Sequence, residues 1–264
     1  MNKEPSVSVW NKFWNRKKDL SKVYPSSPSV LKAILSMGSV EGLKILEVGA
    51  GTGRDSIELA KAGAKVFILD YSEESLKISS ELAVQASGAS PGSAAGSLHL
   101  VQGDAFNSPF SGETFDIVFH QGLAEHFKDP LPLLKENVRL LKKGGFCLCD
   151  VPQTFHLYTV MKHILIAINK WFAGWETQFT IGQLKKLMKK ADLGIVYSYG
   201  DWMRPNLIYR VIRETGFKFG MELPKYPLQG TLYQRLKDRF LNFISRCDVS
   251  RYTQVCIGVI GRKT

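Results

Sequence analysis

The sequence predicts an α/β fold built around a mostly parallel sheet, and three observations support this prediction. Short apolar runs alternate with helical patterns from residue 43 to residue 151, which is the rhythm of βαβ units. A glycine-rich turn follows the first apolar run, where a strand must turn into a helix. The chain has 264 residues, of which 44% are hydrophobic and 22% charged, so it can bury a full core and is not mainly disordered.

Five apolar runs predict the first strands, and turn residues mark the helices between them. The predicted strands are 43–49, 65–70, 98–102, 115–120 and 144–151. The predicted helices run from Arg54 to Ala62, from a cap at Ser72 to about Ala86, and from Asp129-Pro130 through Leu141 to a stop at Gly144. The stretch 87–97 is rich in glycine, serine and alanine, and we expect a mobile loop there.

Beyond residue 151 the pattern changes to an insert followed by further elements. Residues 157–172 place apolar side chains on one face of a predicted helix. A capping box of Thr180 and Gln183 predicts the start of another helix, and residues 193–199 predict a sixth strand. The basic segment 204–246 predicts two helices, and residues 252–261 predict a seventh strand.

Charge and cysteine content limit the partners and the compartment. The 35 lysines and arginines exceed the 24 acidic residues by 11, which favours an anionic partner without naming it. The four cysteines form no Cys-x-x-Cys pair, so we expect neither a disulfide framework nor a metal site, and a cytoplasmic location. We also expect neither an export signal nor a spanning helix, because no apolar run reaches roughly 18 residues.

The glycine-rich turn and two strand-end acids predict a nucleoside site. The turn reads G-x-G-x-G from Gly49, and Arg54 stands beyond it, so the dinucleotide fingerprint G-x-G-x-x-G is not matched. Asp70 follows Gly49 by 21 residues and is suited to accept the hydroxyl groups of a ribose. Asp104 also ends a strand and is suited to accept from an adenine amine. Ligands bind at this edge of such sheets.

In order along the chain, five segments resemble the motif set of the class I S-adenosylmethionine-dependent methyltransferases, especially their small-molecule branch: ILEVGAGTGRD, VFILDYS, VQGDAF, FDIVFHQGLAEHF and LLKKGGFCLCDVP. The resemblance covers residues 43–152. It implies a doubly wound, Rossmann-like sheet of seven strands with the last one antiparallel, and S-adenosylmethionine as cofactor. It also implies these cofactor-binding residues: Glu47, Gly49, Ala50, Gly51, Gly53, Arg54, Asp70, Tyr71, Gly103, Asp104, Ala105, His120 and Gln121.

Methyl transfer needs position and exclusion of water rather than a metal, because the sulfonium methyl is already activated. A general base helps only where the acceptor must lose a proton. His126, in the loop after the fourth strand, is the candidate catalytic base, and a structural role is the alternative. His120 stands where relatives show a small residue, and a buried structural histidine is the alternative to cofactor binding there.

The resemblance places the acceptor side in the segments outside the core. We expect a single domain with an N-terminal helical cap (1–40), a cofactor-binding core (41–152) and acceptor-side inserts (153–178 and 201–250). Three interpretations of the insert helix stay open. It is a lid over an apolar acceptor, a helix that lies in an anionic membrane interface, or a helix packed on the core. Residues 10–24 are expected to close over the cofactor.

The leading hypothesis is therefore a cytoplasmic methyltransferase for a small-molecule or lipid-linked acceptor, with peripheral membrane contact as an option. Three alternatives stay open: an RNA methyltransferase, a nicotinamide-dependent reductase and a catalytically silent cofactor-binding module. Nucleic acid is less favoured, because the tetrapeptide [DNS]-P-P-[YFW] of base-amine methyltransferases is replaced by residues 120–123, His-Gln-Gly-Leu. Cys147 and Cys149 are interpreted as buried core thiols rather than nucleophiles.

Overall fold

The computed structural model of the chain describes residues 6–16, 28–87, 97–171, 173–227, 230–245 and 247–264. Most of the predicted loop at 87–97, and residues 1–5 and 17–27 of the predicted cap, lie outside the described residues. None of the helices in the described ranges has the length and apolar character needed to cross a membrane.

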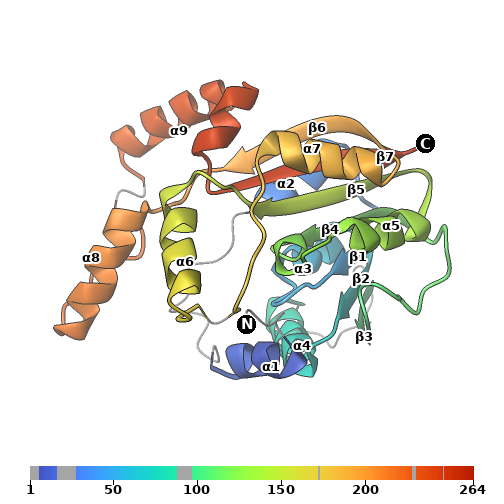
Figure 1. Cartoon of the computed structure of the whole chain (residues 1–264), viewed down its shortest axis with the longest axis horizontal. Helices are drawn as coiled ribbons and strands as arrows, with labels where there is room; N and C mark the ends of the chain where they lie inside the picture. Colours follow the sequence, from blue (N-terminus) through green and yellow to red (C-terminus); the bar gives the residue numbers. More distant parts are fainter. Residues whose placement is uncertain (1–5, 17–27, 88–96, 172, 228–229, 246) are drawn as a thin grey trace.

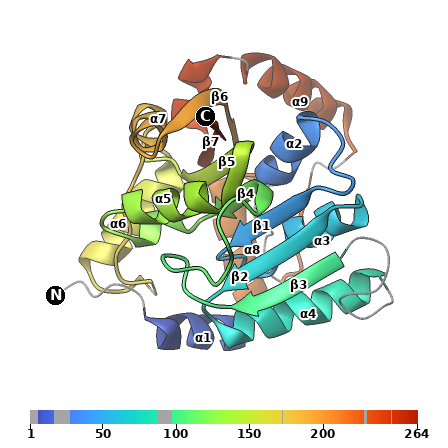
Figure 2. The same cartoon turned by 90° about the vertical axis from the view of Figure 1, so that its right-hand side faces the viewer.

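Seven strands form one sheet in the order β3-β2-β1-β4-β5-β7-β6 (Figures 1 and 2). The strands β1 to β5 pair in parallel, whereas β7 is antiparallel to both β5 and β6. This confirms the predicted seven-stranded, mostly parallel sheet. The strands span Lys44–Val48 (β1), Lys65–Asp70 (β2), Ser97–Gln102 (β3), Phe115–Gln121 (β4), Leu141–Pro152 (β5), Leu193–Asp201 (β6) and Cys256–Lys263 (β7).

Helices cover both faces of the sheet and extend beyond one end of it (Figure 1). The helices α2, α3 and α4 pack on one face, and α5 and α7 pack on the other. The helices α6, α8 and α9 stand to the left of the sheet in Figure 1. The helices span Val7–Arg16 (α1), Ser29–Ser36 (α2), Arg54–Lys61 (α3), Glu73–Ser87 (α4), Leu131–Leu140 (α5), Leu157–Ala167 (α6), Ile181–Lys190 (α7), Leu207–Lys218 (α8) and Leu232–Ile244 (α9), with short 3₁₀ turns at Ala124–His126 and Asp248–Thr253.

The core consists of two apolar layers, one on each face of the sheet. One layer joins β4 and β5 to α5 and α7, and the other joins β1 and β2 to α2 and α3. Cys147 and Cys149 on β5 are fully buried in the first layer, as expected for core thiols. The predicted capping box is present, because Thr180 accepts from the Gln183 backbone while the Gln183 side chain accepts from the Thr180 backbone.

The junction of α5 and β5 differs from the prediction. We expected the helix to carry Leu141 on its apolar face and to stop at Gly144, but α5 ends at Leu140 and the strand starts at Leu141. Leu141 is extended and pairs with Phe115 on β4, and the register then shifts between Phe115 and Ile117. Both arrangements bury Leu141, so the apolar periodicity could not separate them.

The insert helix α6 is the largest departure from the sequence pattern. It ends at Ala167 rather than at residue 172, which itself lies outside the described residues. Its apolar stripe faces outward, and the face that it buries contains Thr159, Lys162 and Ile166. The interpretation of α6 as a helix that packs its apolar stripe on the core is therefore wrong. The stripe residues are 62% (Leu157), 46% (Val160), 59% (Ile164) and 52% (Ile168) exposed.

Candidate active site

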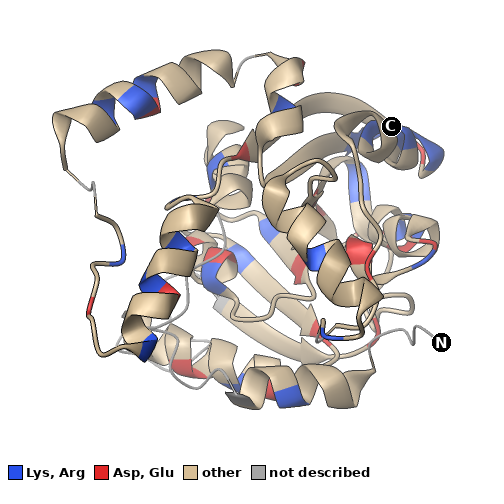
Figure 3. Ribbon diagram, turned by 60° about the vertical axis from the view of Figure 1, so that its left-hand side comes forward, with Lys and Arg blue, Asp and Glu red and all other residues tan. Residues whose placement is uncertain are grey.

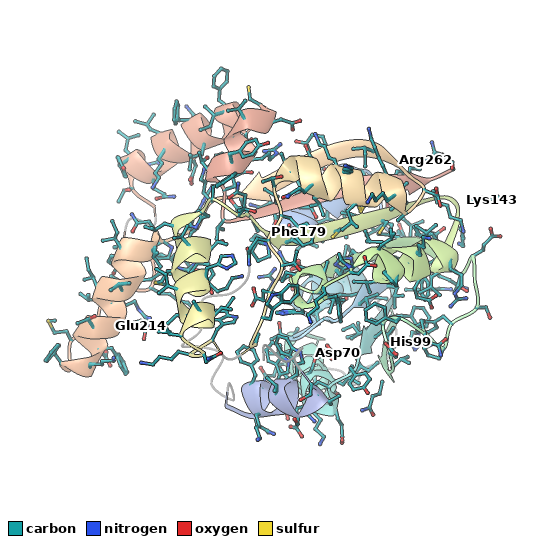
Figure 4. The ribbon with its side chains drawn as sticks, in the orientation of Figure 1. Asp70, His99, Lys143, Phe179, Glu214 and Arg262 are labelled. Atoms are coloured by element: carbon teal, nitrogen blue, oxygen red, sulfur yellow. The ribbon has the colours of Figure 1, made fainter. Side chains whose placement is uncertain are left out.

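A cavity of about 880 Å³ opens at the carboxyl ends of β1, β2 and β4 and is bordered by α1. Figure 4 shows Asp70, at the end of β2, directly above α1. This is the edge of an open α/β sheet at which ligands bind. Twelve of the residues predicted from the sequence line this cavity: Glu47, Gly49, Ala50, Gly51, Arg54, Asp70, Tyr71, Gly103, Asp104, Ala105, Gln121 and His126.

The turn after β1 requires glycine at two lining positions. Gly49 and Gly51 have positive φ angles of 66° and 58°, which side chains of L-residues rarely adopt. A Cβ atom on Gly51 would come within 2.8 Å of the Trp14 ring, and one on Gly49 within 2.8 Å of Leu123. The turn therefore keeps bare backbone at the cavity wall, and α1 closes directly over it.

Gly53 and His120 lie outside the set of lining residues. Gly53 caps α3, and a Cβ atom there would meet Ile68 and Ser79 behind the turn. His120 on β4 is fully buried, and neither ring nitrogen has a hydrogen-bond partner among the described residues. Burial lowers the pKa of His120 to about 4, so its ring is neutral at pH 7. Contact of these two residues with a cofactor stays a prediction.

Glu47 is buried at the base of the cavity. Its carboxylate accepts a hydrogen bond from the Ser56 hydroxyl at 2.5 Å. Burial, and then the nearby Asp55 carboxylate, raise the pKa of Glu47 to about 8. Arg54 lies beside this pair and donates to Asp55 from Nε at 2.7 Å. The region where the resemblance places the methionine part thus combines two acids with one guanidinium.

Asp70 is held in place by the turn and by the start of α4. Its Oδ2 accepts from the Gly51 N–H at 3.2 Å and from the Ser75 hydroxyl at 2.8 Å, and its Oδ1 accepts from the Ser72 N–H at 2.8 Å. Burial raises the pKa of Asp70, and these hydrogen bonds oppose that rise. The Ser72 hydroxyl also donates to Asn11 on α1 at 2.6 Å. The acid and the closing helix are therefore linked through one serine.

The opposite wall of the cavity comes from the ends of β2 and β3. The Asp104 carboxylate is solvent-exposed and accepts the Phe106 N–H at 2.9 Å, which orients it beside Gly103 and Ala105. Tyr71 is 55% exposed and lines the same side. An exposed carboxylate next to an exposed aromatic ring suits recognition of a flat base with an exocyclic amine.

Gln121 connects the cavity to a buried acid on β5. Its side-chain amide donates to Asp150 Oδ1 at 3.4 Å, and Ser29 donates to Asp150 Oδ2 at 3.2 Å. Burial raises the pKa of Asp150 to about 8. Sequence reasoning missed Asp150 because it lies one strand away from the motif that contains Gln121.

These residues fit S-adenosylmethionine. The cavity has the volume of a typical cofactor site, bare glycine backbone at one wall, and acids placed at the ends of three strands. In that assignment Glu47 and Arg54 would hold the amino acid part, Asp70 the ribose, and Asp104 with Tyr71 the adenine. No group of three or more His, Cys, Asp or Glu within the described ranges is arranged to hold a metal ion.

His126 lies at the cavity wall that follows β4. Its ring meets the Trp10 ring edge-on at 4.8 Å, and it is 7% exposed. The pKa of His126 is lowered to about 4, chiefly by burial, while the Glu176 charge opposes this shift and the Lys162 charge adds to it. The imidazole is neutral at pH 7, and its Nδ1 has no hydrogen-bond partner among the described residues. A neutral ring of this kind can accept a proton.

The insert supports this histidine from behind, and none of its described residues lines the cavity. Thr177 donates its N–H to the Glu125 carbonyl at 2.6 Å and its hydroxyl to the Phe127 carbonyl at 3.0 Å. Lys162 and Glu176 form a buried ion pair next to Glu125 and His126, and Trp171 donates to Glu176 at 2.6 Å. From the second predicted insert, Lys225 reaches the cavity.

Sequence reasoning missed two groups of residues at the site. Phe106, Leu123 and Phe127 line the cavity, but aromatic and leucine residues in loops carry no distinctive spacing. Ser72 and Ser75 hold Asp70, and only their position directly after the strand-end acid could have suggested that role. The expected closure by the N-terminal segment is supported within the described residues by Trp10, Phe13 and Trp14, which all line the cavity.

Comparison with known proteins agrees with this geometry. Residues 46–149 match the family model described as "Methyltransferase domain". The chain is 28% identical over 173 residues to a ubiquinone biosynthesis O-methyltransferase of Cereibacter sphaeroides, covering 61% of this chain and 67% of that protein. It is 29% identical over 182 residues to a demethylmenaquinone methyltransferase of Staphylococcus aureus, covering 61% and 72%.

Solved structures show the same fold at lower identity. A Thermotoga maritima methyltransferase, described as a possible histamine N-methyltransferase, superposes with a TM-score of 0.61 at 18% identity, covering 98% of this chain and 99% of that one. The magnesium protoporphyrin IX methyltransferase of Synechocystis has a TM-score of 0.56 at 14% identity, covering 97% and 84%.

The sheet order, the glycine turn and the strand-end acids define a Rossmann-like fold with a candidate nucleoside site at the carboxyl edge of its sheet. Together with the family match and the relatives, they show that the chain belongs to the class I S-adenosylmethionine-dependent methyltransferases. The protein is an S-adenosylmethionine-dependent methyltransferase, and S-adenosylmethionine is its methyl donor.

Proposed function

We propose that the acceptor is a small aromatic molecule with an apolar body, of the quinol type, and that His126 removes the proton of its reacting hydroxyl. The two relatives named above support a quinone-like acceptor, because their names assign them to ubiquinone and menaquinone chemistry. The peripheral, lipid-linked character of such acceptors also fits the apolar surfaces that this chain exposes.

The proposal rests on the composition of one part of the cavity wall, namely the part that the predicted cofactor-binding residues do not form. Trp10, Phe106, Leu123 and Phe127 line this part of the cavity, and His126 is the titratable group among them. The Phe106 and Phe127 rings meet edge-on at 4.6 Å. Rings prefer such edge-to-face contacts, so a planar aromatic acceptor fits this wall.

S-adenosylmethionine supplies an electrophilic methyl group when it is bound. The chain's own contribution is to hold the acceptor, exclude water and move one proton. Trp10 and Trp14 on α1 border the cavity and shield it from solvent. Burial lowers the pKa of His126 to about 4, so the ring is unprotonated across pH 6 to 9 although it is a weaker base than an exposed histidine. In the proposed step this ring takes up the hydroxyl proton as the oxygen attacks the methyl group. Thr177, next to the Lys162–Glu176 pair, holds the loop of His126 through hydrogen bonds to the Glu125 and Phe127 carbonyls.

The test is methyl transfer from S-adenosylmethionine with a radioactive methyl group. We expect product with a hydroxylated benzoquinol that carries a short isoprenoid tail, and none with transfer RNA. His126→Ala should lower turnover by about 100-fold or more, with little change in the affinity for S-adenosylhomocysteine. His126→Gln is the matched variant, because it keeps a polar side chain of similar size without a base.

Labelling of transfer RNA but not of any quinol would overturn the acceptor class. Equal turnover of the His126→Ala enzyme and the wild type across pH 6 to 9 would make His126 a structural residue. A larger thermal stabilisation by NADH than by S-adenosylhomocysteine would contradict the assignment of the cavity residues.

A further inference from the structure

The helix α9 carries an apolar stripe that the described part of the chain leaves uncovered. None of its 13 residues is buried. The stripe repeats at helical spacing, so these side chains share one face of the helix. The exposed residues are 65% (Leu232), 61% (Tyr233), 55% (Leu236), 62% (Phe240) and 69% (Phe243) accessible.

Basic residues border this stripe on both sides. By helical periodicity, Arg235 and Arg239 flank one side of the stripe and Lys237 flanks the other, and all three are exposed. The acid within the helix, Asp238, lies on the inner face and is paired with Arg204 at 2.8 Å. The outer face of α9 therefore presents apolar residues and positive charge together.

The helix α8, which precedes α9 in the chain, also has an exposed apolar stripe, although its arginines lie on the other side of the helix. Ile208, Val211, Ile212 and Phe219 are 52–79% exposed, while Arg210 and Arg213 lie on the more buried side. Figure 3 shows lysines and arginines along both helices, at the outer edge of the molecule. Residues 204–245 contain eight lysines and arginines against three acidic residues, a surplus of five out of the net charge of +11.

We propose that α9, together with α8, docks the protein on an anionic membrane surface. A short helix with bulky apolar residues on one face and arginine and lysine beside them has the composition of helices that lie in a membrane interface. At 1.5 Å per residue, α9 spans about 20 Å, long enough to lie along the headgroup layer and too short to cross a bilayer. The surplus positive charge matches anionic headgroups.

A second copy of the chain fits this surface less well. In a two-fold dimer through α9, the arginines at 235 and 239 would face those of the partner, and Asp238 is already engaged by Arg204. The like charges would repel each other without an acid to compensate them. An anionic bilayer meets the same residues with opposite charge.

The position of the surface connects it to the active site. Lys225 belongs to the segment that joins α8 to α9 and is also one of the residues that line the active-site cavity. Docking through these helices would therefore bring the cavity close to the bilayer, from which a lipid-linked acceptor would enter. This last step rests on the proposed function, whereas membrane binding itself does not.

Flotation of the full-length protein with vesicles tests the docking surface without any acceptor. We expect binding to vesicles of phosphatidylcholine mixed with phosphatidylglycerol, little binding to phosphatidylcholine alone, and release by added salt. Arg235→Glu with Arg239→Glu should weaken binding at least tenfold, and so should Phe240→Ser with Phe243→Ser.

The matched control is Lys189→Glu with Lys190→Glu on α7, which changes the net charge by the same amount at exposed positions on another helix. This variant should bind as the wild type does. Because no residue of α9 is buried, all variants should keep the melting temperature and its rise with S-adenosylhomocysteine. That readout excludes unfolding as the cause of lost binding.

Absence of flotation by the wild type would overturn the proposal, and so would equal losses in the α9 and α7 charge variants. A dimer in light scattering that Phe240→Ser with Phe243→Ser dissociates would assign the surface to a second copy instead. Flotation without quinol methylation would leave the docking surface standing and remove the proposed acceptor. Quinol methylation without flotation would support the proposed acceptor and overturn the docking surface.

Discussion

The Lys162 ammonium group on α6 and the Glu176 carboxylate form an ion pair in which both side chains are almost completely buried, with 2% and 4% of their surface exposed. Glu176 also accepts from Trp171 Nε1, so its charge is compensated by two donors. This pair joins α6 to the segment that contains Glu176, and the adjacent Thr177 connects that segment to the loop of Glu125 and His126 through its hydrogen bonds to the Glu125 and Phe127 carbonyls.

We expect Lys162→Ala to lower the free energy of unfolding by about 3–5 kcal/mol, because it leaves the Glu176 charge buried and unpaired. The double variant Lys162→Met with Glu176→Leu should recover much of that loss, since neither charge then remains. Thermal or urea unfolding of the three proteins measures the difference. Equal stability of Lys162→Ala and wild type would show that the pair does not hold α6.

The exposed stripe of α6 predicts tolerance to polar substitution. Ile164→Ser with Ile168→Ser should change the free energy of unfolding by less than about 1 kcal/mol, since these residues are 59% and 52% exposed. Ile166→Ser on the same helix is the control, because Ile166 is 8% exposed and should cost several kcal/mol. A large drop in the melting temperature of the double variant would show that the apolar stripe of α6 packs against the core.

Asp70 provides a test of the cofactor site. S-adenosylhomocysteine at a hundred times its dissociation constant should stabilise the wild type by about 2.7 kcal/mol. Asp70→Asn should lose most of this ligand-dependent shift, because the carboxylate that would hold the ribose is gone. Glu58→Gln on the exposed side of α3 is the matched control. Unchanged affinity of Asp70→Asn in calorimetry would contradict the ribose assignment.

Glu125 predicts a pH dependence of stability. Burial, and then the Glu176 charge, raise its pKa to about 8 in the folded protein, against about 4.3 for an unperturbed glutamate. The folded state therefore binds the Glu125 proton more tightly than the unfolded state does. Its contribution to stability is complete below about pH 4 and decreases as the pH rises to about 8.

Glu125→Gln keeps the size of the side chain and cannot ionise. Relative to this variant, the wild type should lose a few degrees of melting temperature between pH 5 and pH 8, and no more above that. Glu58→Gln again serves as control, with no such trend. A wild-type curve parallel to that of Glu125→Gln over the whole range would mean that Glu125 is ionised in the folded protein.

The positions of the strands along the chain, the turn after β1 and the acids at the strand ends could be predicted from the sequence, because each is a local signal. A buried strand is a short apolar run, and a glycine turn or a terminal aspartate occupies a set place relative to that run. Asp70 and Asp104 end separate strands, and parallel pairing of β1, β2 and β3 brings their carboxyl ends to one edge. Local pattern and sheet topology were enough for that part of the site.

The orientation of α6 was decided by tertiary structure alone. Helical periodicity separates an apolar face from a polar face, and burial of the apolar face is the usual outcome. Here Lys162 turns inward because Glu176, fourteen residues later, lies in the interior to receive it. Whether a lysine is buried depends on the partner that the fold brings to it, and sequence spacing does not contain that information. The bare outer face of α9 is likewise visible only once the packing of every other element is known.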